Sequence, residues 1–293
     1  MKPPSSRIIL EVERAASDLR RGQPVMLTGF EAYPLYITSG EYKQGGGPVT
    51  DSRHPAVQLM KLAGLLPQAI VETTRADKQP DLLTVSMDAI RQYPAMLASS
   101  LEKISEAQVP MKGAENAQVI AFRPRFGHEE HLAVVIGDLS TQPAPYVRIH
   151  SSCVTGDVFG SVRCDCGNQL HKAIDIIHAQ GGGVVLYLSQ EGRGIGIANK
   201  LRAYALQDKG MDTVEANEAL GFAADERDFE LAAAMLKQLK IHRLILLTNN
   251  PEKVRAISFY GIEVVRREPL VTEINSHNQT YLETKILKLG HQF

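Results

Sequence analysis

The chain has 293 residues, 44% of them hydrophobic, and a formal net charge of −1 at pH 7. This length fits one large domain or two ordinary ones, and the apolar fraction is sufficient for a globular core. The near-neutral charge argues against a nucleic-acid partner, so an anionic ligand must be held by a local cluster of cations. No apolar run is long enough to span a membrane, and the first residues do not resemble a secretory signal.

The first part of the chain, residues 1–112, shows patterns that predict a small α/β domain. Apolar side chains recur at helical spacing from Ile8 to Arg21, and Gly22 follows as a stop signal. In chain order, the patterns that follow predict a strand at 24–28, a glycine-rich stretch at 40–51, a helix at 54–65, a strand at 69–72, a helical stretch at 87–107 and a linker at 109–116.

The second part, residues 113–293, alternates strand and helix patterns. Strands are predicted at 119–122, 131–136, 146–149, 184–188, 244–247 and 262–265. Helices are predicted at 168–180, 197–209, 225–240 and 251–260. Such alternation predicts an α/β sheet covered by helices, with some antiparallel pairs between residues 119 and 149.

All three cysteines, Cys153, Cys164 and Cys166, fall inside one short window. Their odd number and the Cys-x-Cys spacing argue against a disulfide framework, and unpaired thiols without a leader predict a cytoplasmic protein. Thiolates suit zinc. Three interpretations are open: free cysteines buried as small hydrophobes, a closed zinc site with a fourth ligand such as His150 or His171, or an open catalytic site.

Two loops follow predicted strands and precede helices, where α/β proteins commonly bind ligands. Residues 190–196 are rich in glycine, so the backbone there can approach an anion at a helix N-terminus, although the pattern also fits a plain flexible loop. Thr248 and Lys253 are placed to bind a phosphate. The alternative there is a simple N-cap with Pro251 in the first helical turn.

Two further segments each have a structural and a functional interpretation. Asp225 and Asp228 fit the N-cap of a helix. The functional alternative gives Asp225 a proton-transfer role and Arg227 a phosphate role. Tyr204 lies on an amphipathic helical pattern, where a tyrosine is usually a half-buried packing residue.

Taken together, these segments resemble GTP cyclohydrolase II over about residues 117–293. The likeness rests on the sequences at 148–157, 163–167, 190–193, 199–208, 212–217, 221–229 and 247–253, with 281–285 and 290–291 at the end of the chain. The resemblance implies a mixed α/β (α+β) fold, with a GTP cyclohydrolase II-like mixed sheet flanked by helices in residues 113–293 and a smaller α/β N-terminal domain in residues 1–112.

The resemblance also implies a set of site residues. Cys153, Cys164 and Cys166 bind one Zn²⁺ per subunit, and Mg²⁺ accompanies the GTP phosphates. Tyr204 positions the base or the water, Asp225 accepts a proton, and Arg227 is the proposed nucleophile on the α-phosphate. The implied GTP contacts are Arg148, Ile149, His150, Ser151, Ser152, Gln169, Glu191, Gly192, Arg193, Thr213, Thr248 and Lys253.

The implied reaction is the first step of riboflavin biosynthesis in a cytoplasmic homodimer. GTP loses formate through opening of its imidazole ring at C8 and also loses pyrophosphate, which leaves a diamino-ribosylamino-pyrimidinone 5′-phosphate. Arginine stays protonated in proteins, so a charge clamp is an easier role for Arg227 than covalent attack. Ser152 and Ser189 depart from the family pattern, which frequently has glutamate and arginine there, and we expect effects on specificity before effects on catalysis.

Two functional alternatives stay open from the sequence. One is a variant enzyme that stops at a formylated pyrimidine or at GMP, and the other is a zinc-bearing GTP sensor without turnover. The full set of zinc and catalytic residues argues against the sensor, because binding alone needs no open zinc site.

The first part of the chain resembles a truncated, degenerate 3,4-dihydroxy-2-butanone-4-phosphate synthase. Residues 14–22 and 54–67 carry this likeness. The acidic segment with which that synthase binds metal and substrate is missing after residues 25–28, where Thr28 to Tyr33 stands instead. We therefore expect no synthase activity and a role in packing or in support of a dimer.

Overall fold

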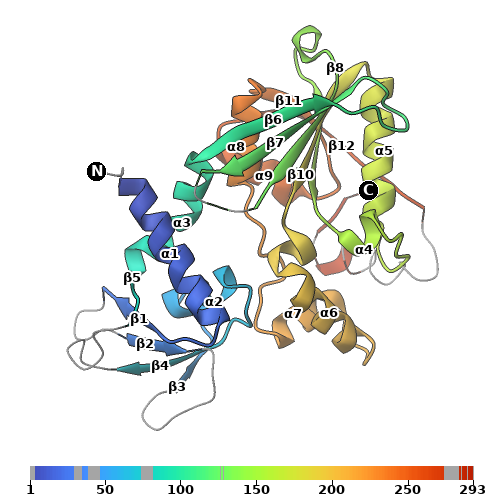
Figure 1. Ribbon diagram of the computed structural model, residues 1–293. Coiled ribbons are helices and arrows are strands. Elements are labelled where there is room, and N and C mark those ends of the chain that lie inside the picture. The colour runs from blue at the N-terminus through green and yellow to red at the C-terminus, as the bar shows by residue number, and fades with distance from the viewer. Residues whose placement is uncertain are drawn as a thin grey trace. The chain divides into compact units, whose positions relative to one another are not determined.

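The structure is a computed structural model that describes residues 4–29, 35–38, 47–73, 82–125, 127, 129–273, 284, 286–288 and 290–292. The chain forms two compact units, each described by itself below (Figure 1). Unit 1 comprises Met1–Leu97, Ile195–Met211 and Glu215–Glu226. Unit 2 comprises Ala98–Gly194, Asp212–Val214 and Arg227–Phe293. Parts of the motifs at 28–33, 40–51 and 281–285 lie outside the described residues.

Unit 1 is built on a five-stranded sheet with the order β3-β4-β2-β1-β5. β1 runs parallel to β5, and the other pairs are antiparallel. Ile9, Val12 and Leu19 of the first helix are fully or almost fully buried, which is the apolar face expected from their spacing. The elements are α1 (Pro4–Arg20), β1 (Val25–Thr28), β2 (Leu35–Thr38), β3 (Gly47–Val49), α2 (Pro55–Leu62), β4 (Ala69–Thr73), β5 (Thr84–Ser86), most of α3 (Met87–Ser99) and α6 (Gly196–Gln207).

Unit 2 is built on a seven-stranded mixed sheet with the order β12-β11-β9-β10-β8-β7-β6. The four strands from β12 to β10 are parallel, whereas β10, β8, β7 and β6 pair antiparallel. The predicted mixed sheet, including antiparallel pairs early in this part, is confirmed. The strands are β6 (Leu101–Gln108), β7 (Ala117–Pro124), β8 (His131–Gly137), β9 (Tyr146–Ser151), β10 (Gly182–Leu188), β11 (Arg243–Leu247) and β12 (Glu263–Glu268).

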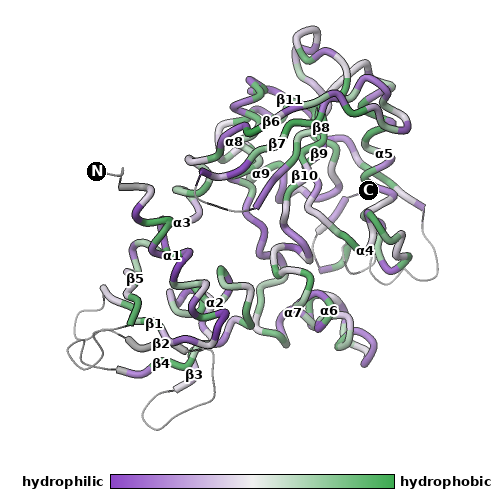
Figure 2. The backbone as a smooth tube through the Cα atoms, in the orientation of Figure 1, coloured by the Kyte–Doolittle hydropathy of each residue, from purple (hydrophilic) through white to green (hydrophobic). Residues whose placement is uncertain are grey.

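Helices cover both faces of this sheet. Val184 and Leu186 of β10 belong to an apolar cluster that includes residues of α8 (Glu230–Gln238) and α9 (Pro251–Phe259). Val185, between them, belongs to a second cluster with Ile177 of α5 (Cys166–Ala179). Because both faces are buried, β8 and β10 are mostly apolar, as Figure 2 shows, whereas β9 carries the buried polar side chains of Arg148 and His150. α4 (Val154–Asp157) also lies in unit 2, whereas most of α7 (Thr213–Ala219) belongs to unit 1.

Three expectations about secondary structure were wrong. The helical stretch at 87–107 ends at Ser99, and Leu101–Gln108 forms the edge strand β6. Seven of the eight residues of β6 are exposed and polar side chains are frequent there, so the strand lacks the alternation that marks a half-buried strand. The helix expected from residue 225 begins only at Glu230.

The third error concerns residues 109–116, which connect β6 to β7 within one sheet instead of linking two domains. The boundary between residues 112 and 113 separates the two parts by their expected functions, and it stays a prediction. The compact units are defined by packing alone and do not test it. In the part of the chain that the structure describes, no helix is both long enough and apolar enough to cross a membrane.

Candidate active site

The three cysteines converge in unit 2. Cys153 is the N-cap of α4, Cys164 precedes α5 and Cys166 is its first residue. Their Sγ atoms all lie within 4.8 Å of one another, and those of Cys153 and Cys164 are 3.7 Å apart. Thiolates that bind zinc tetrahedrally at about 2.3 Å lie about 3.8 Å apart, so this donor set fits zinc.

Two glycines allow this convergence. A Cβ atom on Gly156 would lie 2.9 Å from the Sγ of Cys164 and 3.2 Å from that of Cys153. A Cβ atom on Gly167 would lie 2.3 Å from the carbonyl oxygen of Gly156. α4 and the start of α5 therefore touch backbone to backbone, and any larger residue would push the thiols apart. Neither glycine was predicted to have a role in the site.

The thiols cannot all ionise without a cation. The hydrogen bond with Cys153 and burial raise the pKa of Cys164 to about 11, and the neighbouring thiols raise the pKa of Cys166 well above its ordinary value. A divalent cation offsets this repulsion and takes thiolates as ligands. Among the residues for which the structure gives positions, no histidine, further cysteine or carboxylate joins the group. His171 is exposed and His150 has another partner, so neither supports the closed site considered above.

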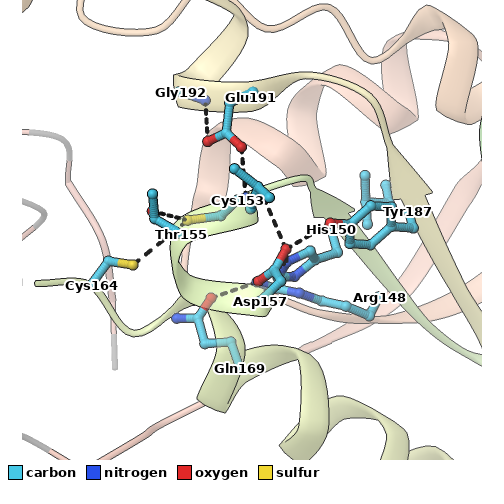
Figure 3. A network of polar contacts seen from close by, with 12 residues as sticks. Arg148, His150, Cys153, Thr155, Asp157, Cys164, Gln169, Tyr187, Glu191 and Gly192 are labelled. Carbon is cyan, nitrogen blue, oxygen red and sulfur yellow. Dashed lines mark hydrogen bonds and ion pairs between the residues drawn. The ribbon is translucent and has the colours of Figure 1, made fainter. Parts of the chain in front are cut away.

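Asp157 is a buried carboxylate that joins three groups beside Cys153 (Figure 3). It accepts hydrogen bonds from the backbone amide of Cys153 at 2.9 Å and from the hydroxyl of Tyr187 at 2.9 Å, and it lies 3.1 Å from Nε2 of His150. The rings of His150 and Tyr187 stack at 5.6 Å. Burial is the main reason that the pKa of His150 is lowered and that of Tyr187 is raised. Asp157 was not among the predicted site residues.

Glu191 connects the glycine-rich loop to the start of α4. Its Oε2 accepts a hydrogen bond from the backbone amide of Val154 at 2.7 Å, and its Oε1 accepts one from Gly192 at 3.1 Å. Gly192 and Arg193 both have positive φ, at 64° and 62°, which is an uncommon conformation for arginine. Gln190 donates to the carbonyl of Asp228 at 2.6 Å. These contacts contradict the interpretation of the segment as a plain flexible loop.

Arg148 and Gln169, both predicted GTP contacts, are bonded to each other inside the protein. Nη2 of Arg148 donates to Oε1 of Gln169 at 2.5 Å, and Nη1 donates to the carbonyl of Leu247 at 3.0 Å. Gln169 donates in turn to the fully buried Asp165 at 2.6 Å. Burial lowers the pKa of Arg148 to about 10. This chain of contacts connects the Cys164–Cys166 turn with the end of β11.

Thr248 and Lys253 are buried, and the N-cap interpretation of their segment is confirmed. Asn250 caps α9, with Pro251 in its first turn, and Thr248 accepts a hydrogen bond from the Asn250 amide at 3.1 Å. Nζ of Lys253 donates to the carbonyl of Ile149 at 2.8 Å.

Phe229 brings two of the predicted cations together. Nζ of Lys253 lies 5.5 Å from the centre of the Phe229 ring, and Cζ of Arg227 lies 5.6 Å from it. These distances are within the range of cation–π contacts. In a sequence, a phenylalanine at such a position is interpreted as a residue of the hydrophobic core. For this reason no functional role was predicted for Phe229.

Tyr204 and Asp225 belong to unit 1. Tyr204 is half-buried on α6, with Nζ of Lys200 5.7 Å from its ring centre. Asp225 is exposed in an irregular segment, so its N-cap interpretation was wrong; Phe229 is the N-cap of α8 and Asp228 accepts from the Glu230 amide. The remaining predicted contacts lie in unit 2: Ile149 and Ser151 in β9, Ser152 directly after it, and Thr213 at the start of α7.

His131 supports the start of the glycine-rich loop, at Ser189, and was not among the predicted site residues. Its Nδ1 accepts a hydrogen bond from the Ser189 amide at 3.1 Å, and the Ser189 hydroxyl donates to the carbonyl of Glu130 at 2.5 Å. Burial lowers the pKa of His131 to about 4, which keeps the ring neutral at physiological pH. A single histidine at the start of an apolar strand carries no signal that would reveal this role.

Known proteins resemble the chain over most of its length. The sequence profile of the family described as GTP cyclohydrolase II matches residues 102–269. GTP cyclohydrolase-2 of Azospirillum brasilense is 49% identical over 246 residues, covering 81% of this chain and 64% of that protein. Riboflavin biosynthesis protein RibBA of Bacillus cytotoxicus is 43% identical over 263 residues, covering 84% and 66%. The RibBA of Chlorobium phaeovibrioides is 42% identical over 250 residues, covering 80% and 61%.

The chain thus spans less than two thirds of the length of these relatives. A solved structure described as a two-domain 3,4-dihydroxy-2-butanone 4-phosphate synthase from A. baumannii aligns with 89% of this chain and 99% of its own. Its sequence identity is 13% and its TM-score is 0.38, which is too low to indicate a shared fold.

Proposed function

The chain belongs to the GTP cyclohydrolase II family, and we propose that it hydrolyses GTP with loss of formate and pyrophosphate. The observation that carries the proposal is the convergence of three Sγ atoms, with no fourth protein ligand beside them in the described residues. Hydrolytic zinc sites typically have three protein ligands, whereas structural ones have four. The product is a diamino-ribosylamino-pyrimidinone 5′-phosphate, and the reaction is the first step of riboflavin biosynthesis.

Cys153, Cys164 and Cys166 would hold the zinc ion. When bound, zinc would supply Lewis-acid chemistry for the hydrolytic opening of the imidazole ring at C8, the electron-poor carbon of guanine. Tyr204 orients the base or the attacking water, and Asp225 accepts the proton that is released. Both roles rest on the family resemblance.

The phosphates are held by cations of unit 2. Arg227 and Lys253 lie around one ring, and we assign Arg227 the role of a charge clamp on the phosphate that loses pyrophosphate. Mg²⁺ accompanies the triphosphate. The wider set of proposed substrate contacts is Arg148, Ile149, His150, Ser151, Ser152, Gln169, Glu191, Gly192, Arg193, Thr213 and Thr248.

The internal hydrogen bonds refine these assignments. Arg148, Gln169 and Glu191 each form hydrogen bonds to other protein groups. We therefore assign them a role in fixing the shape of the site besides a role in contacting the ligand. The hydroxyl of Ser189 is bonded to Glu130 and supplies no charge where the family frequently has arginine. We therefore propose that Ser152 and Ser189 alter the specificity of this chain relative to relatives with glutamate and arginine at these positions, and that they leave catalysis intact.

One incubation tests the proposal. Purified, zinc-loaded chain is mixed with GTP and Mg²⁺, and formate, pyrophosphate and the pyrimidine are followed together. We expect all three, and we expect Cys164→Ser to abolish formate release because it removes a zinc ligand. A formylated product or GMP would identify the variant enzyme, and tight GTP binding without any product would identify the sensor. Near-parent formate release by Cys164→Ser would exclude zinc as the catalyst.

The cytoplasmic location, the homodimer and the lack of synthase activity stay predictions from the sequence. Formation of butanone phosphate from ribulose 5-phosphate by the purified chain would contradict the last of these. Sedimentation of the purified chain would decide the homodimer.

A further inference from the structure

Unit 1 contains the first 97 residues together with two later segments, Ile195–Met211, which carries Tyr204, and Glu215–Glu226, which carries Asp225. In Figure 1, α2 lies beside the ochre segment that contains α6. We propose that residues 1–97 act as a scaffold that holds residues 195–211 and 215–226 in their working conformation, with Lys61 as a positioning residue for Asp225. The inference rests on the proposed function, because that function gives Asp225 its proton-accepting role.

The first contact is an ion pair. Nζ of Lys61, in the last turn of α2, lies 2.6 Å from Oε1 of Glu226, the neighbour of Asp225. The two side chains are only 17% and 18% exposed, so the pair is largely shielded from water and stronger than a surface salt bridge. The same Oε1 accepts a hydrogen bond from the Ala223 amide at 2.7 Å. The Glu226 carboxylate therefore closes the turn around Asp225, and Lys61 fixes that carboxylate.

The second contact follows directly after α2. Gly64 has a φ of +69°, and its carbonyl accepts a hydrogen bond from Nδ2 of Asn199 at 3.4 Å. Asn199 is buried on α6, and its Nδ2 also donates to the carbonyl of Ile195 at 2.9 Å. This contact fixes the first turn of the helix that carries Tyr204.

The third contact is steric. Gly221 has a φ of +85°, and a Cβ atom there would lie 3.0 Å from Cγ of Pro67. Glycine permits both this backbone conformation and the close approach. Residues 61–67 thus reach three points, at 199, 221 and 226, that bracket Tyr204 and Asp225 in the sequence.

These contacts give the first part of the chain a task that needs none of the acidic residues that a synthase would use. The last turn of α2 supplies an ion pair, and the short stretch between α2 and β4 supplies a hydrogen bond and a packing surface. The segment 208–229 has little regular structure besides α7, so it depends on such contacts for its conformation.

Hydrogen–deuterium exchange of the full chain tests the scaffold separately from turnover. Lys61→Met removes the ammonium group and keeps an aliphatic stem. We expect exchange in peptides that cover residues 221–229 to rise about ten-fold, because the hydrogen bond to a charged group is lost, and formate release to slow. Arg53→Met is the matched control, because Arg53 lies in the same unit and forms an exposed ion pair with Asp51. Its exchange and turnover should equal those of the parent.

A second variant removes the same ion pair from its other side, so the test does not depend on the folding of Lys61→Met. Glu226→Gln keeps an oxygen that can accept from the Ala223 amide and loses the charge that Lys61 needs. It should raise exchange in the same peptides, and the double variant should be no worse than either single one, because both remove one interaction.

The two proposals fail in different ways. A parent chain that releases no formate would refute the proposed function and leave the exchange comparison valid. Parent-like exchange at 221–229 in Lys61→Met, or in Glu226→Gln if Lys61→Met does not fold, would overturn the scaffold.

Discussion

Asp157 and Cys153 are hydrogen-bonded to each other in both directions. The Asp157 amide donates to the Cys153 carbonyl at 2.6 Å, and the Asp157 carboxylate accepts from the Cys153 amide at 2.9 Å. The single turn of α4 is therefore closed at both ends, and Cys153, the first of the proposed metal ligands, is oriented by a carboxylate that His150 and Tyr187 hold in place.

We expect Asp157→Ala to weaken zinc binding by about 10- to 100-fold, the usual cost of losing a partner that orients a metal ligand. Competition with a chromophoric chelator measures the affinity, and the absorption of the cobalt-substituted chain reports the geometry of the thiolates. Asp157→Asn keeps one acceptor oxygen and should recover part of the affinity. Asp138→Ala is the control, since Asp138 also accepts a backbone amide, that of Ser140, on an exposed turn. Equal affinity in the Asp157 variants and the parent would contradict this role.

Gly156→Ala should separate the thiols. The added methyl group would lie 2.9 Å from the Sγ of Cys164, 3.2 Å from that of Cys153 and 3.2 Å from the Cβ of Cys166, so the cysteines must move. We expect less than one zinc per chain after dialysis, measured by elemental analysis. Gly160→Ala is the control, because it strains a backbone with φ of +65° yet meets nothing within 4 Å. Full zinc content in Gly156→Ala would show that the cradle is looser than its geometry indicates.

His131 makes the stability of unit 2 depend on pH. Its pKa is about 4 in the folded chain and about 6.5 when unfolded. Between these values the unfolded chain binds the proton and the folded chain does not, so the free energy of unfolding falls as pH drops from about 6.5 to about 4, by about 3 kcal/mol at most. Above about 6.5 this contribution is fully present and constant.

Urea unfolding of the parent and of His131→Asn, at about pH 7.5 and about pH 4.5, isolates this contribution. The asparagine keeps an acceptor for the Ser189 amide and cannot titrate, so the difference between the two pH values should shrink. Replacement of the exposed His242 by asparagine should leave it unchanged. An undiminished pH dependence in His131→Asn would show that other groups cause it.

Phe229→Leu should weaken the hold on the phosphates. The substitution keeps an apolar side chain in the core and removes the ring that Arg227 and Lys253 share. Each cation–π contact contributes about 0.5–2 kcal/mol, so we expect the kcat/KM for GTP to fall about ten-fold. Phe259→Leu is the matched control, because the Phe259 ring is exposed on α9. A parent-like kcat/KM in Phe229→Leu would show that the Phe229 ring does not contribute to binding the phosphates.

The local patterns of the sequence were sufficient for most elements of the sheet in unit 2. β8 and β10 are largely apolar runs, β9 alternates apolar and polar residues, and α5 has a clear apolar face. β6 was assigned to a helix, because its exposed residues alternate weakly and its strand character comes from pairing with β7. The start of α8 was also misplaced, since the capping residues at Asp225 fit an N-cap as well as those at Asp228.

The sequence by itself determined the donor set of the proposed metal site, because all three thiols of the chain lie within one short window and thiolates suit a soft cation. Only the tertiary structure decided which residues support the thiols, the cations and the loop of the candidate site. Gly156, Asp157, Phe229 and His131 act through atoms that are distant in sequence or belong to the backbone, and residue type alone does not reveal such contacts. The pairing of Lys61 with Glu226 is of the same kind, since 165 positions separate two ordinary charges that the fold brings within 2.6 Å.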